Sequence, residues 1–245
     1  MLRLLTFLLV CLFGSGCAVT VKGGLEISQL ADNVYLHTSY KDIPGYGLYP
    51  SNGLVVIDGK SAYIIDTPWP EPDTLQLLAW IKDSGFTPKA SIATHFHEDR
   101  SSGIAALNQQ NIATHASHLT NQKLDQNGAV KAAFEFRGPG FSLLEDKIQV
   151  FYPGPGHTED NVVVWLDEQK ILFGGCLVRA LSTQTMGNTA DASLDSWAGS
   201  VQNLMDEFGD INQVIPGHGE PGGIELLWHT KELAHKTADP GPNDQ

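Results

Sequence analysis

Short apolar segments alternate with amphipathic ones along the chain, and the spacing of the apolar positions predicts what each forms. Apolar runs, most of them rich in β-branched and aromatic residues, predict strands over 33–37, 54–57, 62–65, 91–94, 148–152, 162–166, 171–173 and 213–215. Apolar positions three and four residues apart predict helices over 73–82, 193–208 and 223–235. Helices interspersed with strands along the whole length indicate a single α/β domain.

The first residues have a different pattern from the rest. A short positive region ends at Arg3, an apolar run covers 4–13, and small residues follow. The run is too short to span a bilayer and is typical of a secretory signal, so we expect a signal peptide over 1–18 and export to the periplasm. Cleavage after Ala18 would release a soluble protein. Cleavage before Cys17 would instead leave a lipidated cysteine and an outer-membrane lipoprotein.

No repeat, charge run or low-complexity linker divides the remaining chain, which predicts one domain over 25–237. The closing residues 238–245 include an Asp-Pro-Gly-Pro-Asn stretch and are expected to be disordered. Hydrophobic residues make up 42% of the 245, enough for a sizeable core. A net charge of −13 disfavours nucleic acid and phospholipid surfaces, because it repels phosphate. We expect a monomer that acts on a small molecule.

Cysteine use offers no disulfide framework. The chain has three cysteines, and two of them, Cys11 and Cys17, lie in or beside the predicted signal. Cys176 is then the one thiol certain to remain in an exported chain, so it needs an explanation other than an internal disulfide.

Four predicted strands each end beside a side chain that can bind a metal. Such positions, just past a strand end, let loops carry functional groups on a rigid scaffold. The segments are "SIATHFHED", "IQVFYPGPGHT", "KILFGGC" and "NQVIPGHGE". In the first, His95 and His97 point the same way in extended chain, and Asp99 follows at the same spacing.

These segments supply imidazole, thiolate and carboxylate groups, which together suit zinc better than calcium or magnesium. Six ligands exceed one tetrahedral site, whereas two zinc ions that each keep a position for water would use them all. The candidates are His95, His97, Asp99, His157, Cys176 and His218. A lone histidine is more often a surface or satisfied core residue, and this applies to His37, His115, His118, His229 and His235.

The motifs H-x-H-x-D, Gly-His-Thr, Gly-Gly-Cys and Pro-Gly-His resemble the metallo-β-lactamase fold, and more narrowly the class B, subclass 1 zinc β-lactamases. The likeness runs from about Leu25 to His235 and implies an αβ/βα sandwich. It gives His95, His97 and His157 to a first zinc. It gives Asp99, Cys176 and His218 to a second.

The resemblance also implies residues that act on substrate. Arg179 falls where many relatives carry a lysine that holds the substrate carboxylate, and Asn188 matches an asparagine near the lactam carbonyl. Tyr46 lies near the tip of the segment that corresponds to a mobile hairpin, and Trp69 is a further candidate substrate contact. Asp66 ends a predicted strand and either supports the metal ligands or caps a turn.

The implied function is zinc-dependent hydrolysis of the β-lactam amide bond of penicillins, cephalosporins and carbapenems, which would confer antibiotic resistance. A zinc-bound hydroxide is expected to attack the carbonyl, with Asp99 orienting it and Asn188 helping to stabilise the oxyanion. The enzymatic alternative is another exported hydrolase of this fold that cleaves a thioester or lactone. Cys176, and Arg100 directly after Asp99, argue against it. A non-catalytic periplasmic zinc-binding protein is the alternative of a different class.

Overall fold

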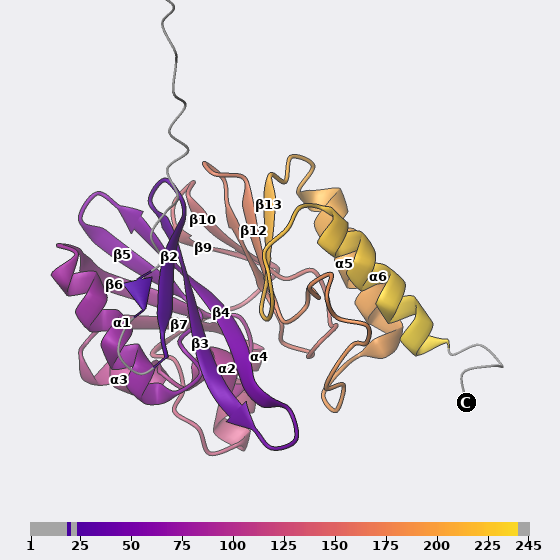
Figure 1. Cartoon of the computed structure of the whole chain (residues 1–245), viewed down its shortest axis with the longest axis horizontal. Helices are drawn as coiled ribbons and strands as arrows, with labels where there is room; N and C mark the ends of the chain where they lie inside the picture. The colour runs from indigo at the N-terminus through magenta and orange to yellow at the C-terminus, as the bar shows by residue number, and fades with distance from the viewer. Residues whose placement is uncertain (1–18, 21–23, 240–245) are drawn as a thin grey trace, which may run out of the picture.

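The structure is a computed structural model that describes residues 19–20 and 24–239 (Figure 1). The predicted signal peptide and all but the first two residues of the predicted tail lie outside the described residues. Within the described residues, no helix combines the length and apolar character needed to cross a bilayer.

Two mixed sheets form the centre of the molecule. In the first, the strands follow one another in sequence order, antiparallel as far as β5 and parallel from β5 to β8. They are β1 (Val19–Thr20), β2 (Glu26–Ala31), β3 (Val34–Ile43), β4 (Gly47–Asp58), β5 (Ser61–Ile65), β6 (Thr87–Ala93), β7 (Ala113–Ser117) and β8 (Phe134–Phe136). The second sheet has the order β13-β12-β11-β10-β9, with only β12 and β13 parallel. It contains β9 (Gly140–Leu144), β10 (Ile148–Phe151), β11 (Val163–Leu166), β12 (Ile171–Gly175) and β13 (Gln213–Pro216).

Helices cover the outer face of each sheet, as the ribbon shows (Figure 1). On the first sheet lie α1 (Glu71–Asp83) and α3 (Ile104–Gln109), and on the second lie α5 (Leu194–Glu207) and α6 (Glu225–Ala238). Two further helices, α2 (Glu98–Ser101) and α4 (His118–Gln126), follow strands β6 and β7. This arrangement is the expected αβ/βα sandwich, and the predicted fold is confirmed.

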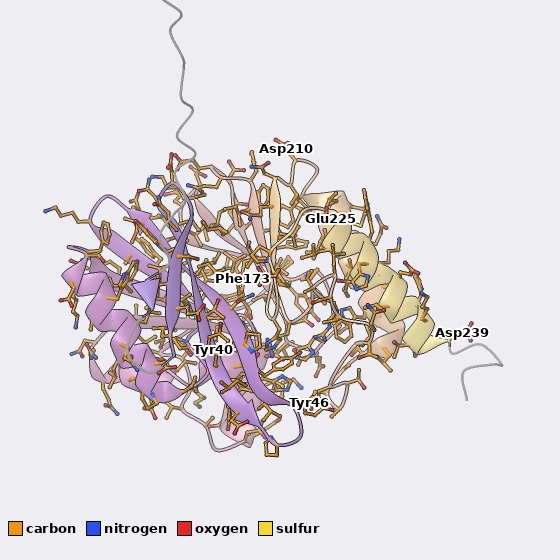
Figure 2. All side chains as sticks on the ribbon, viewed as in Figure 1. Tyr40, Tyr46, Phe173, Asp210, Glu225 and Asp239 are labelled. Carbon is orange, nitrogen blue, oxygen red and sulfur yellow. The ribbon has the colours of Figure 1, made fainter. Side chains whose placement is uncertain are left out.

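Alternation along the strands divides the core into three apolar layers. In β4, Val55 and Ile57 face α1, whereas Leu54 and Val56 face the second sheet, because successive strand side chains point to opposite faces. Phe173 of β12 lies in the layer between the sheets, at the centre of the molecule (Figure 2). Both faces of both sheets are therefore covered, which explains why the central strands read as continuous apolar runs.

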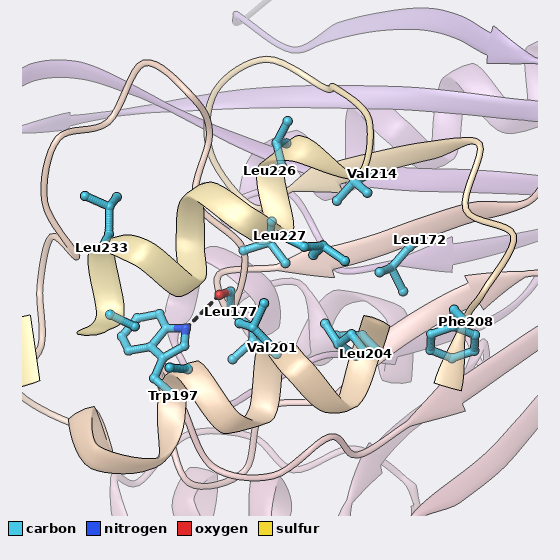
Figure 3. Close-up of a cluster of buried hydrophobic side chains, with 14 of the residues drawn as sticks. Leu172, Leu177, Trp197, Val201, Leu204, Phe208, Val214, Leu226, Leu227 and Leu233 are labelled. Atoms are coloured by element: carbon cyan, nitrogen blue, oxygen red, sulfur yellow. Dashed lines mark hydrogen bonds between the residues drawn. The ribbon is translucent and has the colours of Figure 1, made fainter. Parts of the chain in front are cut away.

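The outer layer of the second sheet packs α5 against α6 (Figure 3). Trp197 is fully buried there, and its indole Nε1 donates a hydrogen bond to the Leu177 carbonyl at 2.8 Å. Leu177 directly follows Cys176, so this contact fixes the end of β12 to the helical layer. A buried tryptophan normally needs such a partner for its N–H group.

The boundaries differ from the predicted ones where polar residues continue a regular element. The strand predicted over 33–37 runs on to Ile43 and pairs with β4 in a long hairpin that projects from the body (Figure 1). Helix α6 runs to Ala238 rather than residue 235. The periodicity signal missed β1, β2, β7, β8, β9 and the helices α2 to α4, since most of these elements are short and bury too few side chains to show a clear pattern.

Candidate metal centre

The six candidate ligands come from segments that follow strands of both sheets. His95 and His97 follow β6, and Asp99 lies in the first turn of α2. His157 lies in the loop after β10, Cys176 comes directly after β12, and His218 comes two residues after β13. The structure brings the six together, although the chain separates the first from the last by more than a hundred residues.

Three imidazoles form one group. His95 Nε2 lies 3.1 Å from His97 Nδ1, which lies 3.2 Å from His157 Nε2. Burial, together with the neighbouring histidines, lowers the pKa of His157 to about 3 and that of His95 well below its usual value. Both rings are thus neutral near pH 7 and have a lone pair available for a metal.

Asp99, Cys176 and His218 form a second group. The Cys176 sulfur lies 3.3 Å from both Asp99 Oδ2 and His218 Nε2, and these two atoms are 3.1 Å apart. The donor atoms of His95, Asp99 and Cys176 also lie within 4.8 Å of one another, so His95 borders both groups. We assign His95 to the group of three histidines because its Nε2 atom lies 3.1 Å from His97 Nδ1.

The chemistry of both donor sets fits zinc. Nitrogen, thiolate sulfur and carboxylate oxygen are its usual ligands, and three protein ligands per ion is the arrangement of a catalytic site. Burial raises the pKa of the Cys176 thiol well above its usual value, more than the nearby Arg100 lowers it. A bound divalent cation would remove that penalty by deprotonating the thiol.

Outer hydrogen bonds orient two of the rings. His97 Nε2 lies 3.0 Å from Asp191 Oδ2, and His218 Nδ1 lies 2.6 Å from the Pro50 carbonyl. A ring nitrogen bonded to an acceptor carries the proton, which leaves His97 Nδ1 and His218 Nε2 as acceptors toward the centre. Asp191 could not be predicted from the sequence, since no spacing connects it to a residue 94 positions away.

A fully buried arginine lies beneath the second group. The Arg100 Nε and Nη2 atoms each lie 2.9 Å from Asp99 Oδ2, and Nη1 lies 3.3 Å from Asp66 Oδ2. Burial opposes ionisation of Asp99, but Arg100 and His218 outweigh it and hold its pKa well below the usual range. Asp99 is therefore a carboxylate at neutral pH. The sequence pattern does not predict this role for Arg100, because its partners Asp66 and Asp99 are recognisable as such only in the folded chain.

Of the two roles predicted for Asp66, supporting the metal ligands and capping a turn, the structure favours the first. Its carboxylate accepts hydrogen bonds from the Thr94 backbone N–H at 2.7 Å and the Thr94 hydroxyl at 2.8 Å, directly before His95. Burial raises its pKa to about 7, against the opposing effect of Arg100. Asp66 thus holds the end of β6 in place.

Close packing around Cys176 depends on a glycine. A Cβ atom at Gly217 would lie 2.8 Å from the Cys176 sulfur and 2.8 Å from its backbone nitrogen, closer than real contacts. The Pro-Gly turn before His218 therefore permits the loop after β13 to approach the end of β12.

Arg179 and Asn188 lie in the segment after Cys176. Arg179 is 7% exposed, and its charge contributes to the low pKa of His157, which puts it near the histidine group. It packs against Gly187, where a Cβ atom would lie 3.0 Å from Nη2. Asn188 is exposed, and its side-chain oxygen accepts a hydrogen bond from the Ala190 N–H at 3.1 Å.

Tyr46 and Trp69 have very different surroundings. Tyr46 is 80% exposed at the tip of the β3–β4 hairpin (Figure 2). The Trp69 ring lies 6.0 Å from the His218 ring, and Lys41 Nζ lies 5.4 Å from its centre. Trp69 therefore borders the second donor group. The Tyr49 ring, which the sequence analysis did not single out, is 5.1 Å from the His218 ring.

Lone histidines remain outside both donor groups. His37, for example, is buried, and its Nε2 lies 3.1 Å from the Asp66 carbonyl oxygen. Among the described residues, the donor groups contain none of His37, His115, His118, His229 and His235.

An αβ/βα sandwich with two adjacent groups of nitrogen, sulfur and oxygen donors is the arrangement of a metallohydrolase. The sequence pattern of the metallo-beta-lactamase superfamily matches residues 46–218. A Pseudomonas aeruginosa protein named metallo-beta-lactamase type 2 is 42% identical over 239 residues, which cover 96% of this chain and 95% of that protein. A Bacillus cereus protein of the same name is 38% identical and covers 86% of this chain and 83% of its own length.

Solved structures agree with this match. The chain is similar to the crystal structure of the DIM-1 metallo-beta-lactamase exposed to ceftazidime, with 48% identity and a TM-score of 0.86 over 88% of this chain and 98% of that one. The protein belongs to the metallo-β-lactamase family, and the expected resemblance is confirmed.

Proposed function

We propose that this enzyme hydrolyses the amide bond of β-lactams with two zinc ions, one at each donor group. The observation that carries the proposal is the convergence of His95, His97 and His157 beside Asp99, Cys176 and His218 in a family of β-lactam hydrolases. Zinc bound there would supply an acidified water and a Lewis acid for the lactam carbonyl.

We assign the transfer of the proton from the attacking water to Asp99. Because Arg100 keeps Asp99 ionised, its carboxylate can accept a hydrogen bond from that water and orient it. The Asp99 carboxylate would then take up the proton that this water loses and pass it to the lactam nitrogen as the C–N bond breaks. Three protein ligands per ion leave room for water and substrate, which favours catalysis over metal storage.

Arg179 and Asn188 are the proposed substrate contacts. Arg179 supplies a positive charge near His157 for the substrate carboxylate, held in place by its packing against Gly187. Because the Asn188 oxygen is already an acceptor, its amide N–H groups are the ones that would donate to the developing oxyanion. Trp69 and Tyr46 would contact the apolar parts of the substrate, Tyr46 after movement of the hairpin.

Hydrolysis of a carbapenem, followed by ultraviolet absorbance, tests the function directly. We expect turnover that a chelator abolishes and added zinc restores. Parallel assays on a thioester and a lactone distinguish the other hydrolases of this fold. Absence of β-lactam turnover in protein that holds two zinc ions would overturn the proposal, and it would favour either those activities or zinc storage.

Zinc content of two variants tests the assignment of the ligands. We expect His97→Ala and Cys176→Ser each to retain about one zinc per chain, because each removes a ligand from a different group. Both should lose carbapenem turnover while their circular dichroism spectra stay native. Two tightly held zinc ions in either variant would contradict the assignment.

We also propose export to the periplasm, on the basis of the apolar run at 4–13. Mass spectrometry of the mature N-terminus distinguishes the two cleavage sites. A start after Ala18 indicates a soluble enzyme, and a lipid-modified Cys17 indicates a membrane tether.

A further inference from the structure

A cavity lies apart from the metal centre. It has a volume of about 330 Å³ and opens between the start of α4, the β8–β9 connection and the loop after β10. Asp160, Phe136 and Tyr152 line it, and none of the six candidate metal ligands does. Its volume is at the lower end of the range for small-molecule sites.

The carboxylate of Asp160 makes this cavity unusual. Asp160 is 1% exposed, and neither of its oxygens has a hydrogen-bond partner within the described residues. Burial raises its pKa, and the Thr120 and Thr158 hydroxyls oppose the rise more than the charge of Lys123 does. The Thr120 hydroxyl is also 2.8 Å from the Ser117 hydroxyl, which competes with Asp160 for it. A buried acid without a partner costs folding free energy that a bound donor would recover.

The other charges around the cavity are already paired. At its rim, Arg137 lies 3.0 Å from Glu135, and His118 lies 3.2 Å from the same carboxylate. From α4, Lys123 lies 3.2 Å from Glu159. Within the described residues, Asp160 differs from these charged groups because its carboxylate is in no ion pair.

The side chains that line the cavity fit an apolar, aromatic ligand. Phe136 and Tyr152 present their rings, and Leu119 and Val162 add aliphatic surface. The Tyr152 hydroxyl donates to the Glu159 carbonyl at 3.0 Å, which leaves the ring as the part available to a ligand. Aromatic faces attract organic cations, and a buried carboxylate binds an ammonium group through charge-assisted hydrogen bonds.

We propose that this cavity is a second binding site, distinct from the metal centre, for a small organic cation that carries a primary ammonium group on an aromatic body. The ammonium would bind Asp160, and the ring would lie between Phe136 and Tyr152. Asp160 belongs to the same loop as His157, which lies three residues before it.

Binding of benzylammonium to the zinc-loaded enzyme tests this site, with benzyl alcohol as the neutral ligand of matched shape. Calorimetry should show the cation binding about tenfold more tightly, the effect of one charge-assisted contact. Backbone amide shifts in NMR should change at Phe136 and Val162. Changes confined to residues around His218 would mean that the amine binds only at the metal centre, and this would overturn the proposal.

Variants separate the site from general effects. Asp160→Asn should lower the affinity for benzylammonium about tenfold, whereas Asp125→Asn, an exposed carboxylate on α4, should not change it. If Asp160→Asn fails to fold, Leu119→Trp fills the cavity and should abolish binding. Equal affinity for cation and alcohol, or undiminished binding in folded Leu119→Trp, would refute the site. Neither result depends on whether the enzyme cleaves β-lactams.

Discussion

At single residues, hydrogen bonds on the outside of the rings decide how the metal centre is presented. Asp191 and the Pro50 carbonyl each bind the outer nitrogen of a centre histidine, His97 and His218. This leaves the inner nitrogen of each ring as an acceptor. Loss of such a partner typically lowers metal affinity by about 10- to 100-fold, because the partner sets the tautomer and orientation of the ring.

Asp191→Asn tests that role while preserving side-chain shape. We expect zinc affinity at the histidine group to fall about tenfold, since the amide binds the ring nitrogen more weakly than the carboxylate does. Competition with a chromophoric chelator measures the change. Asp195→Asn, exposed in the first turn of α5, is the matched control. Unchanged affinity in Asp191→Asn would show that the 3.0 Å contact has no part in metal binding.

His37 gives the fold a pH dependence that is separate from the metal. Burial lowers its pKa to about 3, whereas an unfolded histidine titrates near 6.5. Between these values the unfolded chain binds more protons, so stability is complete above pH 6.5 and falls as the pH drops toward 3.

We expect metal-free wild-type protein to lose about 2 kcal/mol more than His37→Gln between pH 7 and pH 5, measured by urea unfolding. The amide can still donate to the Asp66 carbonyl, which His37 contacts at 3.1 Å. Identical losses in the two proteins would show that His37 is not the group responsible.

Among the elements, Arg100 connects segments that the local pattern does not relate. From the first turn of α2 it donates to the Asn52 carbonyl of β4 and, at 2.8 Å, to the Gly217 carbonyl after β13. It also pairs with Asp66 after β5. One side chain thus joins the hairpin, the end of β5 and the loop that carries His218.

Arg100→Ala should destabilise the metal-free protein by about 3–5 kcal/mol, because it leaves Asp66 and Asp99 buried without their cation. Urea unfolding measures the loss, and zinc should recover part of it by neutralising Asp99. Arg137→Ala is the control, with a side chain 65% exposed and an expected change below about 1 kcal/mol. A similar small change in both variants would mean that the buried network does not stabilise the fold.

In the whole molecule, the two donor groups lie where the two sheets meet. The histidine group combines His95 and His97, after β6 of the first sheet, with His157, after β10 of the second. The second group likewise combines Asp99 with Cys176 and His218. Each metal ion would therefore bind residues from both halves of the sandwich and would stabilise their association.

Zinc should raise the melting temperature of the metal-free protein by about 5–10 °C at a concentration near a hundred times its dissociation constant. Differential scanning fluorimetry measures the shift, with calcium as the control ion because it disfavours nitrogen and sulfur ligands. A shift of equal size with calcium would show nonspecific binding to an acidic protein. No shift with zinc would mean that the halves associate without help from a metal.

The sequence by itself determined the class of fold, most of the central strands and the chemical types of the candidate ligands. These features depend on local periodicity and on Gly and Pro at strand ends. Both can be recognised within short segments of the sequence. Tertiary structure decided how far the β3–β4 hairpin extends, which atoms of His97 and His218 face the centre, and the burial of Arg100. It also decided that Asp160 lines a cavity. These outcomes depend on contacts between residues far apart in the chain, and periodicity carries no information about which distant segments meet.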